Sequence, residues 1–253
     1  MVKTKILQID KLTESQVIQM FRMMDQYYAK MTEETFRRDL SEKQKVILLL
    51  GEDGLIKGFS TILQISMISR GRSFIAIFSG DTVLQQEYWG NGALATAFGR
   101  YLTEVKLKNP FTRVYWFLIS KGYKTYLLMT NNFPVHYPRH ERATPNRYQN
   151  IMDVFYKMRF GEKYNPAQGL IHFENSKASY LKWQVAEIDE SLRLNQRISF
   201  FEQRNPQWKE GVELACIAKV TLWIPLRYAI KRVIKGLRGR ESKAAVVYQG
   251  SGF

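Results

Sequence analysis

The segment SGDTVLQQEYWGNGALATAFGRYL, residues 79–102, constrains the fold more than any other part of the chain. It starts as the end of a strand-like run, passes through a Gly-Asn-Gly turn at 90–92, and continues at once with apolar residues at helical spacing. A helix N-terminus leaves backbone N–H groups without partners and carries partial positive charge, and glycine lets an anion approach the backbone closely. We therefore expect residues 89–94 to hold a phosphate group.

The rest of the pattern predicts an α/β domain with a mixed sheet and helices on both faces. Apolar runs and turn signals predict strands at 3–9, 73–85, 113–120, 169–173 and 212–218, and a hairpin at 45–67. Capping residues and helical spacing predict helices at 13–31, 32–43, 121–133 and 146–160 and near 178–200, besides the helix after the turn. This order of elements is typical of a layered α/β domain.

Composition limits the environment of the chain. Its 253 residues are 45% hydrophobic, which is enough for a sizeable core, and its only cysteine, Cys216, excludes an internal disulfide and fits a reducing compartment. No metal-ligand spacing is present. The N-terminus does not resemble a signal peptide and no apolar run is long enough to span a bilayer, so we expect a cytoplasmic protein. The net charge of +15 favours an anionic partner.

The order of elements and the glycine turn resemble the GNAT superfamily of acyltransferases over residues 3–173. The family's turn reads [RQ]-x-x-G-x-[GA], and Tyr88, Gly90 and Gly92 are similar to a longer form of it, although Trp89 or Glu87 stands where the family has Arg or Gln. The resemblance implies a mixed, mostly antiparallel sheet flanked by helices. It also implies acyl transfer to an amine or hydroxyl.

The resemblance implies coenzyme A thioester as the acyl donor, with an acyl-carrier protein as the alternative. The residues that would contact the pyrophosphate are Trp89, Gly90, Asn91, Gly92, Ala93 and Leu94. The residues whose backbone would contact the pantetheine arm are Thr82, Val83 and Leu84.

Acyl transfer needs a base for the acceptor and an acid for the leaving thiolate. Asp81 and Glu87, on or at the end of the strand before the turn, are the candidate bases, and Asp81 can instead belong to a bulge. The resemblance implies a tyrosine near the thioester sulfur, and Tyr126 and Tyr156 are the candidates. Both can equally be core aromatics.

A polar loop at 134–145 supplies a further candidate. His136 is one of only three histidines, and three prolines stiffen the loop around it. The H-x-x-x-x-E spacing of His136 and Glu141 is close to a motif of glycerolipid acyltransferases, but the order of elements differs from that family. The alternative is a solvated surface loop.

The sequence predicts a domain at 1–175 and an extension at 176–253. Residues 214–240 carry seven basic and no acidic residues, with apolar residues at helical spacing, and predict a basic amphipathic helix at about 218–240. Such a helix can lie peripherally on an anionic membrane, which favours a lipid-related acceptor, or it can pack on the domain. Two other functions remain open: a non-catalytic GNAT-like binding protein, and a nucleic-acid-binding protein, which we do not favour because no reader motif is present.

Overall fold

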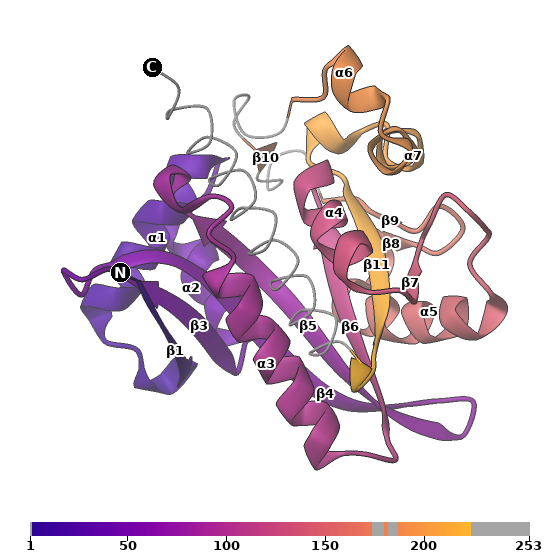
Figure 1. The fold of residues 1–253 in the computed structure, drawn as a ribbon, viewed down its shortest axis with the longest axis horizontal. Coiled ribbons are helices and arrows are strands. Elements are labelled where there is room, and N and C mark those ends of the chain that lie inside the picture. The colour runs from indigo at the N-terminus through magenta and orange to yellow at the C-terminus, as the bar shows by residue number, and fades with distance from the viewer. Residues whose placement is uncertain (1, 174–179, 182–186, 224–253) are drawn as a thin grey trace, which may run out of the picture.

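The computed structural model describes residues 2–173, 180–181 and 187–223. In these residues one large sheet has the strand order β1-β3-β4-β5-β6-β11-β9-β8, with β7 paired to β11, and β10 pairs with β2 separately (Figure 1). Every pair of neighbouring strands is antiparallel except β5 and β6. The predicted fold class, a mixed and mostly antiparallel sheet flanked by helices, is therefore confirmed.

The elements follow the predicted order through β6. The strands are β1 (Lys3–Gln8), β2 (Tyr28–Ala29), β3 (Lys45–Leu50), β4 (Ile56–Ser69), β5 (Arg72–Leu84), β6 (Arg113–Ser120), β7 (His136–Tyr137), β8 (Tyr164–Asn165), β9 (Leu170–Ile171), β10 (Tyr180–Leu181) and β11 (Glu213–Val220). The α-helices are α1 (Glu14–Tyr27), α2 (Glu33–Ser41), α3 (Ala93–Lys108), α4 (Tyr123–Asn132), α5 (Asn146–Phe160), α6 (Glu190–Arg193) and α7 (Gln196–Arg204). Single 3-10 turns are η1 (Ile9–Lys11), η2 (Gln86–Tyr88), η3 (Gly161–Lys163) and η5 (Trp208–Glu210).

Helices cover both faces of the sheet, as the alternation of buried side chains in β6 requires. Trp116 and Leu118 lie in one core with apolar residues of α3, α4 and α7. Tyr115 and Phe117 point to the other face and pack with residues of α5. The helices α1 and α2 cover a third cluster with residues of β3 and β4. The sheet is therefore the middle layer of three.

The predicted caps of the first two helices are present. The side chain of Thr13 accepts a hydrogen bond from the backbone N–H of Gln16, and the Gln16 side chain accepts one from the Thr13 backbone N–H. Thr32 caps α2 in the same way through the backbone N–H of Thr35, without the reciprocal bond of a capping box.

Two predicted helices differ from the structure. The helix predicted at 13–31 ends at Tyr27, because residues 28–29 pair with β10. The helix predicted near 178–200 is wrong as one element: residues 180–181 form β10 and two short helices follow later. Asp189 and Asn195 each accept a backbone hydrogen bond at the start of α6 and α7, so the chain has separate helix starts there.

The sheet continues beyond the predicted boundary at residue 175. Strand β11 lies between β6 and β9, so residues 213–220 belong to the core sheet and not to a separate extension. The predicted amphipathic helix at about 218–240 begins inside this strand, and its residues from 224 onward lie outside the described residues. Among the helices that the structure describes, none has the length and apolarity needed to cross a bilayer.

Candidate functional site

The strands β5 and β6 part at the end of their shared ladder. They pair in parallel as far as Ser79 and Leu118, and β5 then continues to Leu84 with a partner only on its β4 side. The register between β4 and β5 also shifts here, which places one additional residue of β5 at Gly80–Asp81. A bulge bends the strand that carries it and interrupts pairing. The β6-facing edge of residues 80–84 therefore has no strand partner in the described part of the chain.

The surroundings of Gly80 in the bulge leave little room for a side chain. A Cβ atom built on Gly80 would lie 2.6 Å from Cε of Lys43 and 2.6 Å from Oγ1 of Thr61. Lys43 is buried and its ammonium donates to the backbone carbonyl of Asp39 at 2.9 Å. Burial lowers the pKa of Lys43, and the nearby charge of Asp81 opposes that shift. Asp81 is thus a bulge residue, as the alternative interpretation predicted. The bulge brings the Asp81 carboxylate close enough to the buried ammonium of Lys43 to affect its pKa.

The Gly-Asn-Gly turn leads from β5 through η2 into α3, as predicted. Gly90 and Gly92 have φ angles of 79° and 75°, and a Cβ atom added at either position would meet no other atom within 4 Å. The backbone N–H of Ala93 donates to Oδ1 of Asn91 at 3.1 Å. None of the described residues accepts a hydrogen bond from the backbone N–H of Gly92 or of Leu94. The corner is therefore open, and these two N–H groups lie without an acceptor at the N-terminus of a 16-residue helix.

Trp89 is one of the two residues that can stand where the GNAT motif has Arg or Gln. Its indole N–H donates to the backbone carbonyl of Leu84 at 2.9 Å, which fixes the turn against the free end of β5. The ammonium of Lys124, on α4, lies 4.5 Å from the centre of the indole ring. A cation–π contact of this length holds a positive charge beside the turn. The sequence alone did not single out Lys124.

Four side chains gather where the parted strands end, and we call them the charged cluster: Tyr28, Asp81, Lys121 and Glu213. The ammonium of Lys121 lies 3.4 Å from the carboxylate of Glu213 and 5.3 Å from the ring centre of Tyr28. Burial raises the pKa of Glu213, the contact with Lys121 opposes the shift, and the charge of Asp81 adds to it. Burial also raises the pKa of Tyr28, and the charges of Asp81 and Glu213 add to that shift. Asp81 thus acts electrostatically on both groups.

This cluster has the properties of an acid–base site. A buried carboxyl whose pKa is raised accepts a proton at a pH closer to neutral than an exposed one does. Tyr28 stays protonated at neutral pH and can donate a hydrogen bond. Three of the four residues were not predicted. The signal for Glu213 was present, because a lone carboxylate opens the apolar run VELACIA.

The two candidate tyrosines are bonded inside the core. Tyr156 is fully buried, and its hydroxyl oxygen lies 2.8 Å from the carbonyl oxygen of Leu118 and 2.7 Å from that of Cys216. It also accepts a hydrogen bond from the Cys216 backbone N–H at 3.1 Å, so it links β6 to β11. The hydroxyl of Tyr126 donates to the backbone carbonyl of Pro138 at 3.0 Å. The structure does not bring either hydroxyl to the charged cluster.

His136 and Glu87 also lie apart from the charged cluster. His136 is buried, with Nδ1 2.6 Å from the carbonyl oxygen of Phe133, and burial lowers its pKa. It pairs with Ala218, five residues along β11 from Glu213, a distance of about 17 Å in a strand. Glu87 is exposed on η2. The hydrogen bond with Asp53 raises the pKa of Lys57, and the charge of Glu87 adds a smaller contribution.

The polar loop at 134–145 forms its own contacts. The guanidinium of Arg139 donates to both carboxylate oxygens of Glu141 at 2.8 Å. This pair lowers the pKa of Glu141 to about 2. The H-x-x-x-x-E spacing therefore does not produce a carboxylate that orients His136, which agrees with the difference in the order of elements.

Tyr156→Phe tests whether this residue is structural. We expect the variant to lose about 1–3 kcal/mol of stability, because the carbonyls and the N–H that it satisfies stay buried, and to melt roughly 2–12 °C lower. Activity per folded molecule should not change. Two measurements on the same sample test this: thermal unfolding, and release of the coenzyme A thiol from acetyl-CoA. Loss of thiol release at unchanged stability would identify Tyr156 as catalytic instead.

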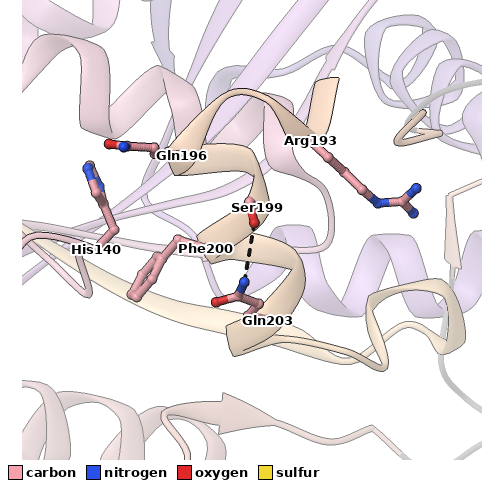
Figure 2. Close-up of a pocket in the computed structure, with 6 residues that line it drawn as sticks. All are labelled: His140, Arg193, Gln196, Ser199, Phe200 and Gln203. Atoms are coloured by element: carbon pink, nitrogen blue, oxygen red, sulfur yellow. Dashed lines mark hydrogen bonds between the residues drawn. The ribbon is translucent and has the colours of Figure 1, made fainter. Parts of the chain in front are cut away.

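Two hollows lie on the described surface. One, of about 310 Å³, lies on α7 and is lined by His140, Arg193, Gln196, Ser199, Phe200 and Gln203. Figure 2 shows that its side chains do not converge on one point, since Arg193 points away from His140. The other, of about 410 Å³, borders Tyr88 and Asn91 of the turn. In the described part of the chain no group of three His, Cys, Asp or Glu side chains is placed to bind a metal.

No protein-family model and no curated protein sequence matches the chain. Its fold is similar to that of an acetyltransferase from Trypanosoma brucei, at 15% identity over 57% of this chain and 98% of that one, with a TM-score of 0.38. It is also similar to glucosamine-6-phosphate N-acetyltransferase from Arabidopsis thaliana, at 13% identity over 57% and 97% of the two chains, with a TM-score of 0.38. A probable N-acyltransferase from Enterococcus faecalis matches at 13% identity over 72% and 46%, with a TM-score of 0.39. Structural similarity at TM-scores this low assigns no function.

Proposed function

We propose that the protein is an acyltransferase that uses a coenzyme A thioester as its donor. The observation that supports this most is the parting of β5 from β6 directly beside an open helix N-terminus. A strand edge without a partner can bind the amides of a pantetheine arm as a neighbouring strand would. The helix N-terminus next to it suits a pyrophosphate. Both features are in the order in which coenzyme A carries these groups.

The residues of the donor site follow from this placement. The backbone of residues 80–84 would bind the pantetheine arm, and the backbone N–H groups of Gly92 and Leu94, which have no acceptor among the described residues, would bind the pyrophosphate. Lys124 supplies a positive charge beside the same turn. In this role it replaces the Arg or Gln that the family motif has and this sequence lacks.

The charged cluster supplies the chemistry where β5 and β6 part. The nitrogen or oxygen of the acceptor attacks the thioester carbonyl, the new C–N or C–O bond forms, and the C–S bond breaks to release the coenzyme A thiolate. The acceptor proton passes to Glu213, directly or through one water. Tyr28, kept protonated by its surroundings, can donate a hydrogen bond to the leaving thiolate, which takes its proton from solvent.

Gly92→Asp tests the donor site. An acid at this position adds a negative charge within a few Å of the pyrophosphate, and we expect coenzyme A to bind at least tenfold more weakly. The measurement is the rise in Tm with acetyl-CoA concentration, which reports affinity for the folded protein.

Gly71→Asp is the matched control, because Gly71 also has a positive φ, of 71°, and the same open surroundings, at the far end of β5. It should bind acetyl-CoA as the parent does. If the parent protein shows no rise in Tm, or if both aspartate variants behave alike, the donor site is not at this turn.

Thiol release separates this proposal from a non-catalytic binding protein. Acetyl-CoA is offered with a panel of primary amines and alcohols, and free thiol is measured over time. Binding of acetyl-CoA without thiol release for any acceptor would favour the binding protein. Release that depends on the acceptor supports the transferase.

A further inference from the structure

The end of the sheet opposite the charged cluster exposes an unusual set of side chains. Four large apolar side chains are exposed there, with exposed fractions of 68% for Ile68, 61% for Leu107, 100% for Phe111 and 69% for Trp223. Exposed basic residues surround them, namely Arg70, Arg72, Lys108, Arg113 and Lys219. We call these nine residues the basic edge.

The sheet register brings the four segments of the basic edge together. In the parallel pair β5–β6, Phe74 lies beside Arg113, so Arg72 and Phe111 each precede that pair by two residues. In the antiparallel pair β6–β11, Val220 lies beside Val114, so the chain runs on past the start of β6 toward Trp223. The end of α3 and the end of β11 lie in the lower part of Figure 1, and the hairpin of β4 and β5 extends from there to the right.

The segments of α3 and β11 are close enough for their charges to interact. The charge of Lys219 on β11 contributes, after burial, to lowering the pKa of Lys106 near the end of α3. The segments 66–73, 106–113 and 219–223 contain no acidic residue. The nearest acid along α3, Glu104, is paired with Lys108 at 2.6 Å. The edge therefore carries a net positive charge.

Hydrogen bonds from two side chains at the end of α3 hold the loop that carries Phe111 in place. The ammonium of Lys106 donates to the carbonyls of Pro110 and Thr112, each at 2.8 Å, and the Asn109 side chain donates to the Val105 carbonyl at 2.9 Å. The loop thus presents a fully exposed aromatic ring on an ordered backbone. Inserting that ring into a binding partner therefore requires little further ordering of the chain.

We propose that the basic edge docks the protein on an anionic lipid bilayer. Aromatic and aliphatic side chains that enter the interface, ringed by Arg and Lys that meet anionic headgroups, are the combination that peripheral membrane binding requires. Single-stranded RNA is the other polyanion to consider, but Ile68 and Leu107 have no aromatic face on which a base could stack. The inference does not depend on the proposed enzymatic function.

This orientation has a consequence for the acceptor. The charged cluster lies beyond the opposite end of β6, whose eight residues span about 26 Å. A site that far from the membrane surface faces the aqueous side. A soluble acceptor therefore fits better than a lipid held in the bilayer.

Phe111→Ser and Arg72→Glu test the docking surface in the full-length chain. Co-sedimentation is measured with vesicles of phosphatidylcholine, with and without phosphatidylglycerol. We expect the parent to bind only the vesicles with phosphatidylglycerol. Phe111→Ser should weaken the partition coefficient about tenfold, and Arg72→Glu at least fivefold.

Matched controls are available at distant surface positions. Leu194→Ser removes a side chain that is 86% exposed on the α6 side, and Lys5→Glu reverses a charge on the outermost strand, β1. Both should bind vesicles as the parent does. All four positions are exposed, and unchanged melting temperatures confirm that the variants fold.

The outcomes decide between the partners. Selective loss in Phe111→Ser and Arg72→Glu supports the proposal. Three results overturn it: no binding of the parent to anionic vesicles, equal losses in the control variants, or RNA binding that Arg72→Glu weakens and Phe111→Ser leaves unchanged while vesicles do not bind.

Discussion

Replacing Glu213 by glutamine is expected to lower kcat/KM for acyl transfer by about 10²–10⁴-fold, the contribution of a positioned general base. Glutamine keeps the shape of the side chain and cannot accept a proton. Because burial raises the pKa of this carboxyl, the parent should gain activity with rising pH above the range where ordinary carboxyls ionise. The variant should lose this acid limb. Thiol release from acetyl-CoA, followed across pH with the best acceptor of the panel, measures both effects.

The stability of the same variant separates a catalytic from a structural role. The pKa of Glu213 is higher in the folded chain than in the unfolded one, so its ionisation subtracts stability as the pH rises through that interval. Glu213→Gln should therefore not melt at a lower temperature than the parent near neutral pH. A loss of activity together with a fall in Tm would contradict this assignment.

Two further variants sharpen the test of Glu213. Glu210→Gln changes an exposed carboxylate three residues away and should retain full activity. Glu213→Asp keeps the carboxylate but shortens its reach, and should restore part of the activity along with the acid limb. If Glu213→Gln transfers acyl groups as fast as the parent, Asp81 becomes the remaining carboxylate of the cluster to test.

The sequence predicted the strand, the turn and the helix of the proposed donor site because these elements are local. The strand, the turn and the helix follow one another between residues 73 and 108, and each has its own signal: alternation, two glycines and helical spacing. The apolar residues at helical spacing after the turn, including Leu94, Leu102 and Val105, are buried on one face of α3, as that spacing predicts. Such features depend on neighbours in the chain, which a single sequence displays.

The charged cluster could not be predicted in the same way because it depends on long-range pairing. Glu213 meets Lys121 only because β11 inserts beside β6, and no local pattern states which strand a late segment will join. The roles of Tyr126 and Tyr156 were undecided for a related reason. Spacing gives the side of the helix on which a tyrosine lies, but not the carbonyl that its hydroxyl will reach.

Replacing Phe117 by alanine is expected to cost about 3–5 kcal/mol of folding free energy, as for other large aromatic side chains lost from a core. Phe117 is fully buried in the middle of β6, and its ring stacks on that of Phe155 in α5 with 4.1 Å between ring centres. The change would leave a cavity between the sheet and α5, where close packing leaves little room for collapse. The melting temperature should fall by roughly 6–20 °C.

Phe111→Ala is the matched control for this loss, because it removes the same ring from a position that is 100% exposed. Its stability should stay within about 0.5 kcal/mol of the parent. Thermal and denaturant unfolding of the two variants compare the same chemical change inside and outside the core. If Phe117→Ala were as stable as Phe111→Ala, α5 would not pack on this face of β6, and the layered arrangement that holds β6 beside the parted end of β5 would be incorrect.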